Sequence, residues 1–228
     1  MARRSIPPFS SLWQQHETIY VGLFYMALQR LFEESCDISS ENAISERLCL
    51  ILNSLCFEKS QSLQCEIRTP DWEKPIQPVS ESELKGGRSS KRPDFTCKRT
   101  NPFANCADEH EISFHVECKL LGNPSSINWK LNKNYVTEGI RRFDCSSHEY
   151  GKRAVSGMMI GYIISMSHKK IQDEINNHQK LHCPDNPKIV FLFDDKSVQQ
   201  CHQQIKRKNV TPNSFKLIHL WVDLRNNI

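Results

Sequence analysis

The sequence predicts an α/β fold, in which a mixed central β-sheet is flanked by helices. One observation behind this prediction is the stretch Ile112–Leu120, where apolar and polar residues alternate without a break, as in a strand with one buried face. The other is that segments with helical spacing of apolar residues come before and after this stretch. Helices on both sides of a strand-forming region are typical of helix layers packed on a sheet.

Two amphipathic helices are expected before the first strands. In Leu12–Cys36 the apolar residues recur at helical spacing, which predicts a long packed helix. Its aromatic and aliphatic surplus leaves a homodimer surface open as an alternative. A second helix is expected over Glu41–Leu55, whose apolar residues form one stripe, with Ser39 or Ser40 as its N-terminal cap.

The remaining elements follow in chain order. The expected strands and helices are a strand over Leu63–Thr69, a strand over Pro93–Lys98, a strand over Ile112–Leu121, a helix over Asn134–Phe143, a strand over Val155–Ile164, a polar helix over Lys169–Leu181, an apolar sheet extension over Lys188–Phe193 and a final strand over Phe215–Asp223.

Composition indicates a single domain with a full core. The chain has 228 residues, of which 38% are hydrophobic and 25% charged, and these values exclude a disordered or fibrous protein. Its ten cysteines form no Cys-x-x-Cys pair, and no signal peptide is recognisable at the start, so we expect free thiols, no structural zinc and a cytoplasmic location. The longest apolar stretch, Ala154–Met166, is too short for a membrane span.

Acidic and basic residues gather on the polar face of the predicted strand over Ile112–Leu121. Glu117 and Lys119 point to that face, and Asp94 opens a strand that can lie beside them. Carboxylate oxygens are the ligands that Mg²⁺ prefers, and an ammonium group beside them can act on a metal-activated water. The arrangement therefore predicts a divalent-metal site suited to phosphodiester hydrolysis.

The Pro93-Asp94 pair followed by Glu117-Cys118-Lys119 resembles the signature of the PD-(D/E)XK nuclease superfamily, which has the restriction-endonuclease-like fold. The resemblance implies a core over residues 38–165, in the order helix, three strands, helix, strand, with a helical extension at 1–37 and an α/β extension at 166–228. It implies a Mg²⁺-dependent endonuclease acting on DNA, in which Mn²⁺ substitutes, Asp94 and Glu117 hold the metal and Lys119 orients the water.

A further acid is expected from the helix that precedes the first strand of such a core. Glu41 projects onto the apolar stripe of its helix and can reach over the strand edge to the metal, whereas Glu46 points away from the stripe. Glu41 is therefore preferred as a catalytic residue and metal ligand, with Glu66 as a third candidate. A first-turn acid that only complements the helix dipole is the alternative.

Basic residues near the acids are expected to bind nucleic acid. Because the net charge is only +4, affinity must come from local patches. One patch is a Gly/Ser-rich loop before Asp94, and the other is the helix after the Glu-x-Lys strand, for which a charged outer face is the alternative. The residues are Lys85, Arg88, Lys91 and Arg92 in the loop, and Lys133, Arg141 and Arg142 in and before the helix.

The segment from Tyr135 to Phe143 looks like one seen in prokaryotic defence nucleases of this fold. This likeness implies the nuclease subunit of an anti-phage or restriction system, working as a homodimer or with a partner ATPase or sensor. An RNA- or tRNA-cleaving nuclease and a catalytically silent nucleic-acid-binding module remain open as alternatives.

Overall fold

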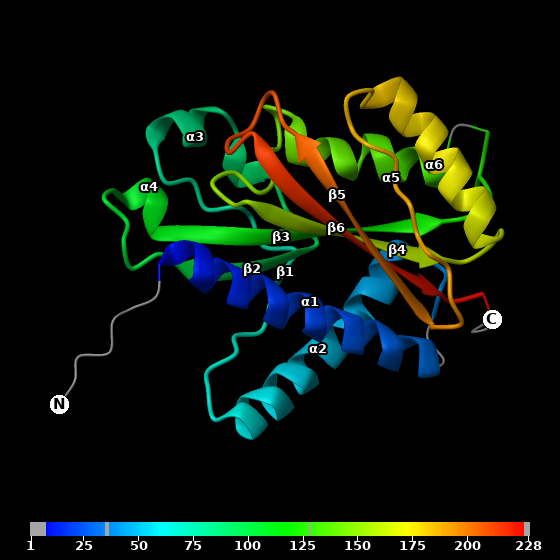
Figure 1. The fold of residues 1–228 in the computed structure, drawn as a ribbon, viewed down its shortest axis with the longest axis horizontal. Helices are drawn as coiled ribbons and strands as arrows, with labels where there is room; N and C mark the ends of the chain where they lie inside the picture. The colour runs from blue at the N-terminus through cyan, green and yellow to red at the C-terminus, as the bar shows by residue number, and fades with distance from the viewer. Residues whose placement is uncertain (1–7, 35–36, 128, 226–228) are drawn as a thin grey trace.

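The computed structural model describes residues 8–34, 37–127 and 129–225, and it has an α/β fold with a mixed six-stranded sheet flanked by helices (Figure 1). The strand order is β1-β2-β3-β4-β6-β5. β1, β2 and β3 form an antiparallel meander, β4 and β6 continue parallel to β3, and β5 closes the far edge antiparallel to β6. The strands are β1 Asp71–Trp72, β2 Phe95–Thr100, β3 Glu111–Leu121, β4 Ser156–Ile163, β5 Val198–Lys206 and β6 Ser214–Asp223.

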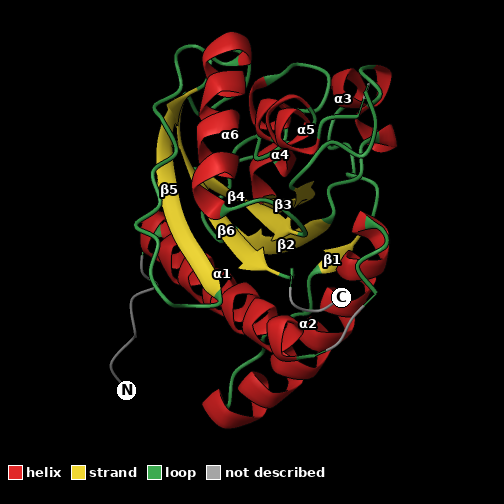
Figure 2. Ribbon diagram, turned by 90° about the vertical axis from the view of Figure 1, so that its right-hand side faces the viewer, coloured by secondary structure: helices red, strands yellow, loops and turns green. Residues whose placement is uncertain are grey.

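Long helices cover both faces of the sheet. Figure 2 shows α1 (Phe9–Glu33) and α2 (Glu41–Leu63) on one side, and α5 (Leu131–Thr137) and α6 (His168–His182) on the other. Shorter pieces lie around the β2–β3 end of the sheet and after α5: they are α3 Glu81–Lys85, η1 Arg88–Ser90, α4 Ala107–His110 and η2 Ile140–Asp144. In the part of the chain that the structure describes, no helix has both the length and the apolar character needed to cross a membrane.

The apolar stripe of α1 is part of the protein core. Phe24, Ala27, Leu28 and Leu31 are completely buried. Trp13, near the start of the helix, packs against Phe114 and donates a hydrogen bond to Ser156 Oγ at 2.9 Å. The stripe that sequence alone left open as a homodimer surface is therefore covered by α2 and the sheet, and a homodimer remains a prediction. The expected helix end, Cys36, lies outside the described residues.

The predicted strand over Leu63–Thr69 is wrong. α2 continues to Leu63 and ends at Gln64, which adopts the left-handed conformation at φ 49°. The following segment is extended, but its backbone bonds to helix side chains rather than to a strand: the Ile67 N–H donates to Ser60 Oγ at 3.1 Å, and the carbonyl of Arg68 accepts from the Tyr20 hydroxyl at 2.7 Å. The first strand of the meander is instead the two-residue β1.

The apolar run Lys188–Phe193 is not a strand either, and the reason is the same. The N–H of Ile189 donates to Asn176 Oδ1 and that of Phe191 to Gln172 Oε1, both at 2.8 Å, so side chains of α6 take the place of a neighbouring strand. The strand at this edge is β5, whose glutamine-rich sequence carries little of the usual strand signal. Its inward-facing Gln203 accepts, through Oε1, a hydrogen bond from His219 Nε2 at 3.0 Å.

The predicted helix over Asn134–Phe143 is divided in two. α5 ends at Thr137, and after Gly139 the chain turns into the 3₁₀ helix η2. A Cβ on Gly139 would lie 2.5 Å from Met159 Cε and 2.5 Å from the Tyr135 carbonyl oxygen, so only glycine allows this close approach. The break matters because it turns Arg142 of η2 toward Glu117 on β3.

Candidate active site

β3 has the two faces that its alternation predicts. Phe114, Val116 and Cys118 are completely buried on the side of α1, and the polar residues lie on the other side. That polar face is not open to solvent, however. Glu117 has no exposed surface and Lys119 is only 8% exposed; Arg142 of η2 contacts Glu117, and Glu41 of α2 contacts Lys119. This burial changes the chemistry of every ionisable group on the face.

Asp94 lies beside Glu117, as predicted from the two adjacent strands. β2 and β3 pair antiparallel with Phe95 opposite Val116, so one further step places Asp94 opposite Glu117. Because β2 begins at Phe95, the edge of β3 beyond Val116 has no strand neighbour on this side. Asp94 Oδ2 accepts the freed N–H of Cys118 at 2.5 Å, which fixes the carboxylate at the strand edge.

Glu41 reaches the same edge from the first turn of α2. Its Oε2 accepts the N–H of Leu120 at 3.1 Å, and its Oε1 accepts from Lys119 Nζ at 2.7 Å. Ser40 caps the helix by accepting the Ala43 N–H at 3.1 Å, which fixes where the helix starts and hence where Glu41 points.

Glu41, Glu46 and Glu66 were the candidates for the further acid, and of these the structure brings only Glu41 to the site. Glu46 is exposed on the outer side of α2. Glu66 is also exposed and pairs with Arg68 at 2.9 Å, away from β3. The geometry therefore agrees with the preference for Glu41, while its catalytic role stays a prediction.

Lys119 is the centre of the polar network. Its Nζ lies 3.0 Å from Glu117 Oε1 and 2.7 Å from Glu41 Oε1, and it donates to the Cys118 carbonyl at 2.6 Å. Burial by itself would lower the pKa of Lys119, but the charges of Glu117, Asp94 and Glu41 outweigh it and raise the pKa above its ordinary value. Lys119 is therefore a fixed ammonium group.

Arg142, predicted from sequence to bind a phosphate, belongs to this network. Its Nη1 donates to Glu117 Oε1, and its guanidinium lies 5.9 Å from the centre of the Tyr150 ring. Burial would lower the pKa of Arg142, but Glu117 raises it more, so the side chain is charged. We call Asp94, Glu117, Lys119, Glu41 and Arg142 together the Glu117 site.

The Glu117 site holds three carboxylates against two cations. Burial raises the pKa of Asp94 to about 6, and burial together with the Asp94 charge raises the pKa of Glu117 to about 8. Glu117 Oε2 is buried and has no hydrogen-bond partner. A buried carboxylate oxygen without a partner is unfavourable, and a hard cation would satisfy it.

The donor set fits Mg²⁺ in kind, because the acids offer only oxygen ligands. Within the described ranges, no three His, Cys, Asp or Glu side chains are already arranged as a metal site. The physical reason is visible in the network: nitrogens of Lys119 and Arg142 contact Glu117 Oε1, and Lys119 also contacts Glu41. The other oxygen of Glu117, Oε2, is free of these contacts.

The segment before Asp94 is not the open loop that sequence predicted, because it contains α3 and η1. Arg88 is only 6% exposed and pairs with Glu149 at 3.0 Å and with Glu83 at 3.5 Å, so the prediction that it is a free nucleic-acid-binding cation is wrong. Lys85 and Arg92 are exposed and Lys91 is half-buried, which leaves them accessible to a ligand.

Lys133 and Arg141 lie outside the Glu117 site. Both are exposed: Lys133 lines a shallow hollow with Lys130 and His178, and Arg141 lines another with Asp144 and His182. Adjacent residues on η2 thus have different surroundings, since Arg142 points inward and Arg141 outward. Arg141 therefore lies on a charged outer face, which was the alternative to phosphate binding.

Sequence reasoning missed a second buried group of charges. Glu83 is 5% exposed and lies 2.6 Å from Arg153, 3.1 Å from Lys152 and 3.5 Å from Arg88. Burial raises the pKa of Glu83, but the Val79 N–H and the two closest cations outweigh it and lower the pKa to about 2. No sequence pattern signals this group, because its members are separated by up to 70 residues. We call Glu83, Arg88, Glu149, Lys152 and Arg153 the Glu83 cluster.

Comparison with known proteins adds no family to this geometry. Neither a scan against protein-family models, nor a search of curated proteins, nor a search of solved structures found a match to this chain.

Proposed function

We propose that this protein is a Mg²⁺-dependent, cytoplasmic nuclease of the PD-(D/E)XK superfamily that hydrolyses phosphodiester bonds in DNA. The observation that carries the proposal is the convergence, on one stretch of strand edge, of Asp94 just before β2, Glu117 and Lys119 on β3, and Glu41 on α2. Three acids and an ammonium around a buried carboxylate oxygen without a partner match the chemistry expected of such a nuclease.

The roles of the residues follow from their positions. Asp94, Glu117 and Glu41 would hold the metal, with Glu117 Oε2 as the oxygen already free to bind it. When bound, Mg²⁺ supplies Lewis acidity to the reacting phosphate and lowers the pKa of the attacking water. Lys119, fixed by Glu41 and the Cys118 carbonyl, would orient that water and offset charge in the transition state. Arg142 would bind a non-bridging phosphate oxygen.

The order of elements also supports the superfamily. α2, β1, β2, β3, α5 and β4 follow one another as helix, three strands of an antiparallel meander, helix and parallel strand, which is the order that the resemblance implies. In this proposal β6 and β5 extend the core sheet beyond β4, and α1 is an added helix on the face that carries α2.

DNA as substrate and a place in a prokaryotic anti-phage or restriction system complete the proposal, with a second copy or an ATPase or sensor subunit as partner. The substrate is supported by accessible cations next to the acids: Arg92 is exposed and Lys91 half-buried just before Asp94.

The test is incubation of the purified protein with supercoiled plasmid, linear duplex DNA and structured RNA, each with Mg²⁺, Mn²⁺, Ca²⁺ or EDTA. We expect cleavage of DNA with Mg²⁺ or Mn²⁺, binding without cleavage with Ca²⁺, and no cleavage with EDTA. Cleavage confined to RNA would show that the substrate is RNA and not DNA. Full activity after exhaustive chelation would contradict the metal mechanism.

A further inference from the structure

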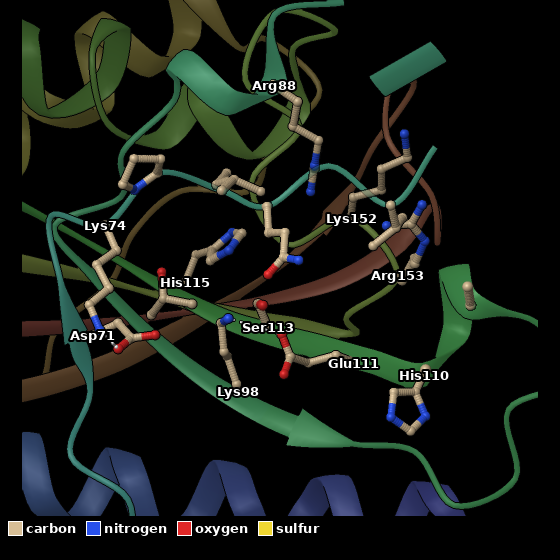
Figure 3. A pocket seen from close by; sticks show the side chains of 16 residues that line it. Asp71, Lys74, Arg88, Lys98, His110, Glu111, Ser113, His115, Lys152 and Arg153 are labelled. Atoms are coloured by element: carbon tan, nitrogen blue, oxygen red, sulfur yellow. Dashed lines mark hydrogen bonds and ion pairs between the residues drawn. The ribbon is translucent and has the colours of Figure 1, made fainter. Parts of the chain in front are cut away.

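A cavity of about 460 Å³ lies beside the Glu117 site on the same face of β3 (Figure 3). β3 contributes Glu111, Ser113 and His115 to its wall and continues on the same face with Glu117. Residues two apart along a strand are separated by about 6.6 Å, so the cavity begins one such step from the proposed catalytic acid. Its volume is in the range of small-ligand pockets.

His115 provides the cavity with a hydrogen-bond donor that has no partner. Its Nδ1 accepts the N–H of Gly151 at 2.9 Å, so this nitrogen carries no proton and the neutral ring holds its proton on Nε2. The residue is 1% exposed, and Nε2 is buried without a hydrogen-bond partner. A buried N–H left unpaired is unfavourable, so a ligand with a matching acceptor would be stabilised here.

Two of the acids that pair with the cations of the cavity, Asp71 and Glu111, belong to its lining, and two others, Glu83 and Glu149, lie outside it. Each cation of the lining already has an acidic partner: Lys74 pairs with Asp71 at 2.5 Å, Lys98 with Glu111 at 3.0 Å, Arg88 with Glu149 at 3.0 Å, Lys152 with Glu83 at 3.1 Å and Arg153 with Glu83 at 2.6 Å. Figure 3 shows these cations, together with Asp71 and Glu111, around the His115 ring, with Arg88 reaching toward it. Because each of these cations is already paired, an uncharged polar ligand can bind here without separating an ion pair.

The wall also has an apolar part, formed by Pro75, Ile76 and Val79. An apolar surface facing a single directed donor suits a flat heterocycle with acceptor atoms on its edge. Nucleobases have this chemistry, because their ring nitrogens and carbonyl oxygens accept hydrogen bonds.

We propose that this cavity binds one nucleobase of the substrate strand, next to the phosphate held at Glu117, and that His115 Nε2–H donates to an acceptor on the edge of that base. The proposal rests on the proposed nuclease function. A base can enter only after leaving its stack, which costs least in a single-stranded or distorted substrate. The protein is therefore expected to select a position on the strand by its base as well as by its backbone.

The experiment measures binding of a labelled single-stranded oligonucleotide in Ca²⁺, with one abasic site moved along the strand. For the wild-type protein, one position should weaken binding about three- to ten-fold, the loss expected for one hydrogen bond. His115→Asn keeps an acceptor for the Gly151 N–H but lacks the Nε2–H, and should bind the intact strand as weakly as wild type binds that abasic strand. His202→Asn, the same change at an exposed histidine of β5, should retain the wild-type profile.

A second measurement needs only the wild-type protein. 2-Aminopurine placed at successive positions should gain fluorescence at the same single position, since its emission rises when the base is unstacked. A flat abasic profile with no 2-aminopurine response, while Mg²⁺-dependent cleavage persists, would overturn the base pocket and leave the nuclease intact. Absence of both binding and cleavage for every nucleic acid would overturn the nuclease function and the pocket with it.

Mononucleotides added as competitors distinguish a free nucleotide from a base of the strand. Competition that is lost in His115→Asn, together with a flat abasic profile, would assign the cavity to a free nucleotide and overturn the proposal.

Discussion

The Glu83 cluster and the Glu117 site are both largely buried groups of charges, but only in the first does the central acid have partners for both of its carboxylate oxygens among the described residues. In the Glu83 cluster two carboxylates face three cations, and the pKa of Glu83 is lowered to about 2. In the Glu117 site three carboxylates face two cations, and the pKa of Glu117 is raised to about 8 by burial and by Asp94. We expect the first arrangement to stabilise the fold. The second, with its excess of carboxylates and the raised pKa of Glu117, is typical of a site that binds an additional cation.

The largest expected effects come from matched substitutions of the two central acids. Glu117→Gln should abolish cleavage, by a factor of at least about 10²–10³, while the free energy of unfolding stays the same or rises, because a buried acid with a raised pKa is removed. Glu83→Gln should do the reverse: it leaves Arg88, Lys152 and Arg153 without their shared partner and should cost about 3 kcal/mol of stability.

Denaturant unfolding and plasmid cleavage by the folded fraction measure both variants. The comparison between the two regions would break if Glu83→Gln were as stable as wild type, or if Glu117→Gln still cut DNA at a near wild-type rate.

The second-largest effect is expected at acid pH, where the Glu83 cluster should lose its contribution to stability. The folded-state pKa of Glu83, about 2, is below its ordinary value of 4.5, so its contribution to stability is complete above pH 4.5 and is lost as the pH falls toward 2. This loss amounts to about 3 kcal/mol at most. Chemical denaturation between pH 6 and pH 3 should show a smaller loss of stability for Glu83→Gln than for wild type. If the free energy of unfolding fell equally with pH in the two proteins, the titration of Glu83 would not contribute to the acid sensitivity.

Glu41 and Glu46 provide a sharper test within one helix. Glu41→Ala removes a partner of Lys119 and of the Leu120 N–H, and should reduce cleavage about 10- to 100-fold. Glu46→Ala, at an exposed position of the same helix, should leave the rate unchanged. The reverse result in a cleavage assay would show that Glu46, and not Glu41, acts together with Asp94 and Glu117.

The smallest effect concerns phosphate contacts. Lys91→Gln and Arg92→Gln should each reduce the slope of log affinity against log salt by about 0.9, because each removes one cation beside the site. Base preference should not change. Lys170→Gln, at an exposed position of α6, is the control and should leave the slope as it is. Titrations of DNA binding at several salt concentrations decide this, and unaltered slopes would make Lys91 and Arg92 ordinary surface residues.

Local pattern predicted β2, β3, β4 and β6, but neither the two-residue β1 nor the glutamine-rich β5. The alternation of Ile112–Leu120 and the pairing of Asp94 with Glu117 could be inferred from sequence because a strand repeats every two residues. The segments Leu63–Thr69 and Lys188–Phe193 look like strands but bond to side chains of α1, α2 and α6, which no local pattern reveals.

The same limit applies to the charges. Glu41 was identified from the helix stripe, but the pairing of Arg88 depends on Glu83 on the preceding helix α3 and on Glu149, 61 residues away in sequence. Only the three-dimensional arrangement distinguishes an inward Arg142 from an outward Arg141.

The most direct test of the unsatisfied Glu117 site is the thermal unfolding of wild type, Glu117→Gln and Glu83→Gln with EDTA or with Mg²⁺. A cation that binds only the folded protein raises the unfolding midpoint as its concentration rises. Mg²⁺ should raise the midpoint of wild type and of Glu83→Gln but not that of Glu117→Gln. An unchanged wild-type midpoint, or an equal rise in Glu117→Gln, would contradict the claim that the buried acids of this site hold a metal.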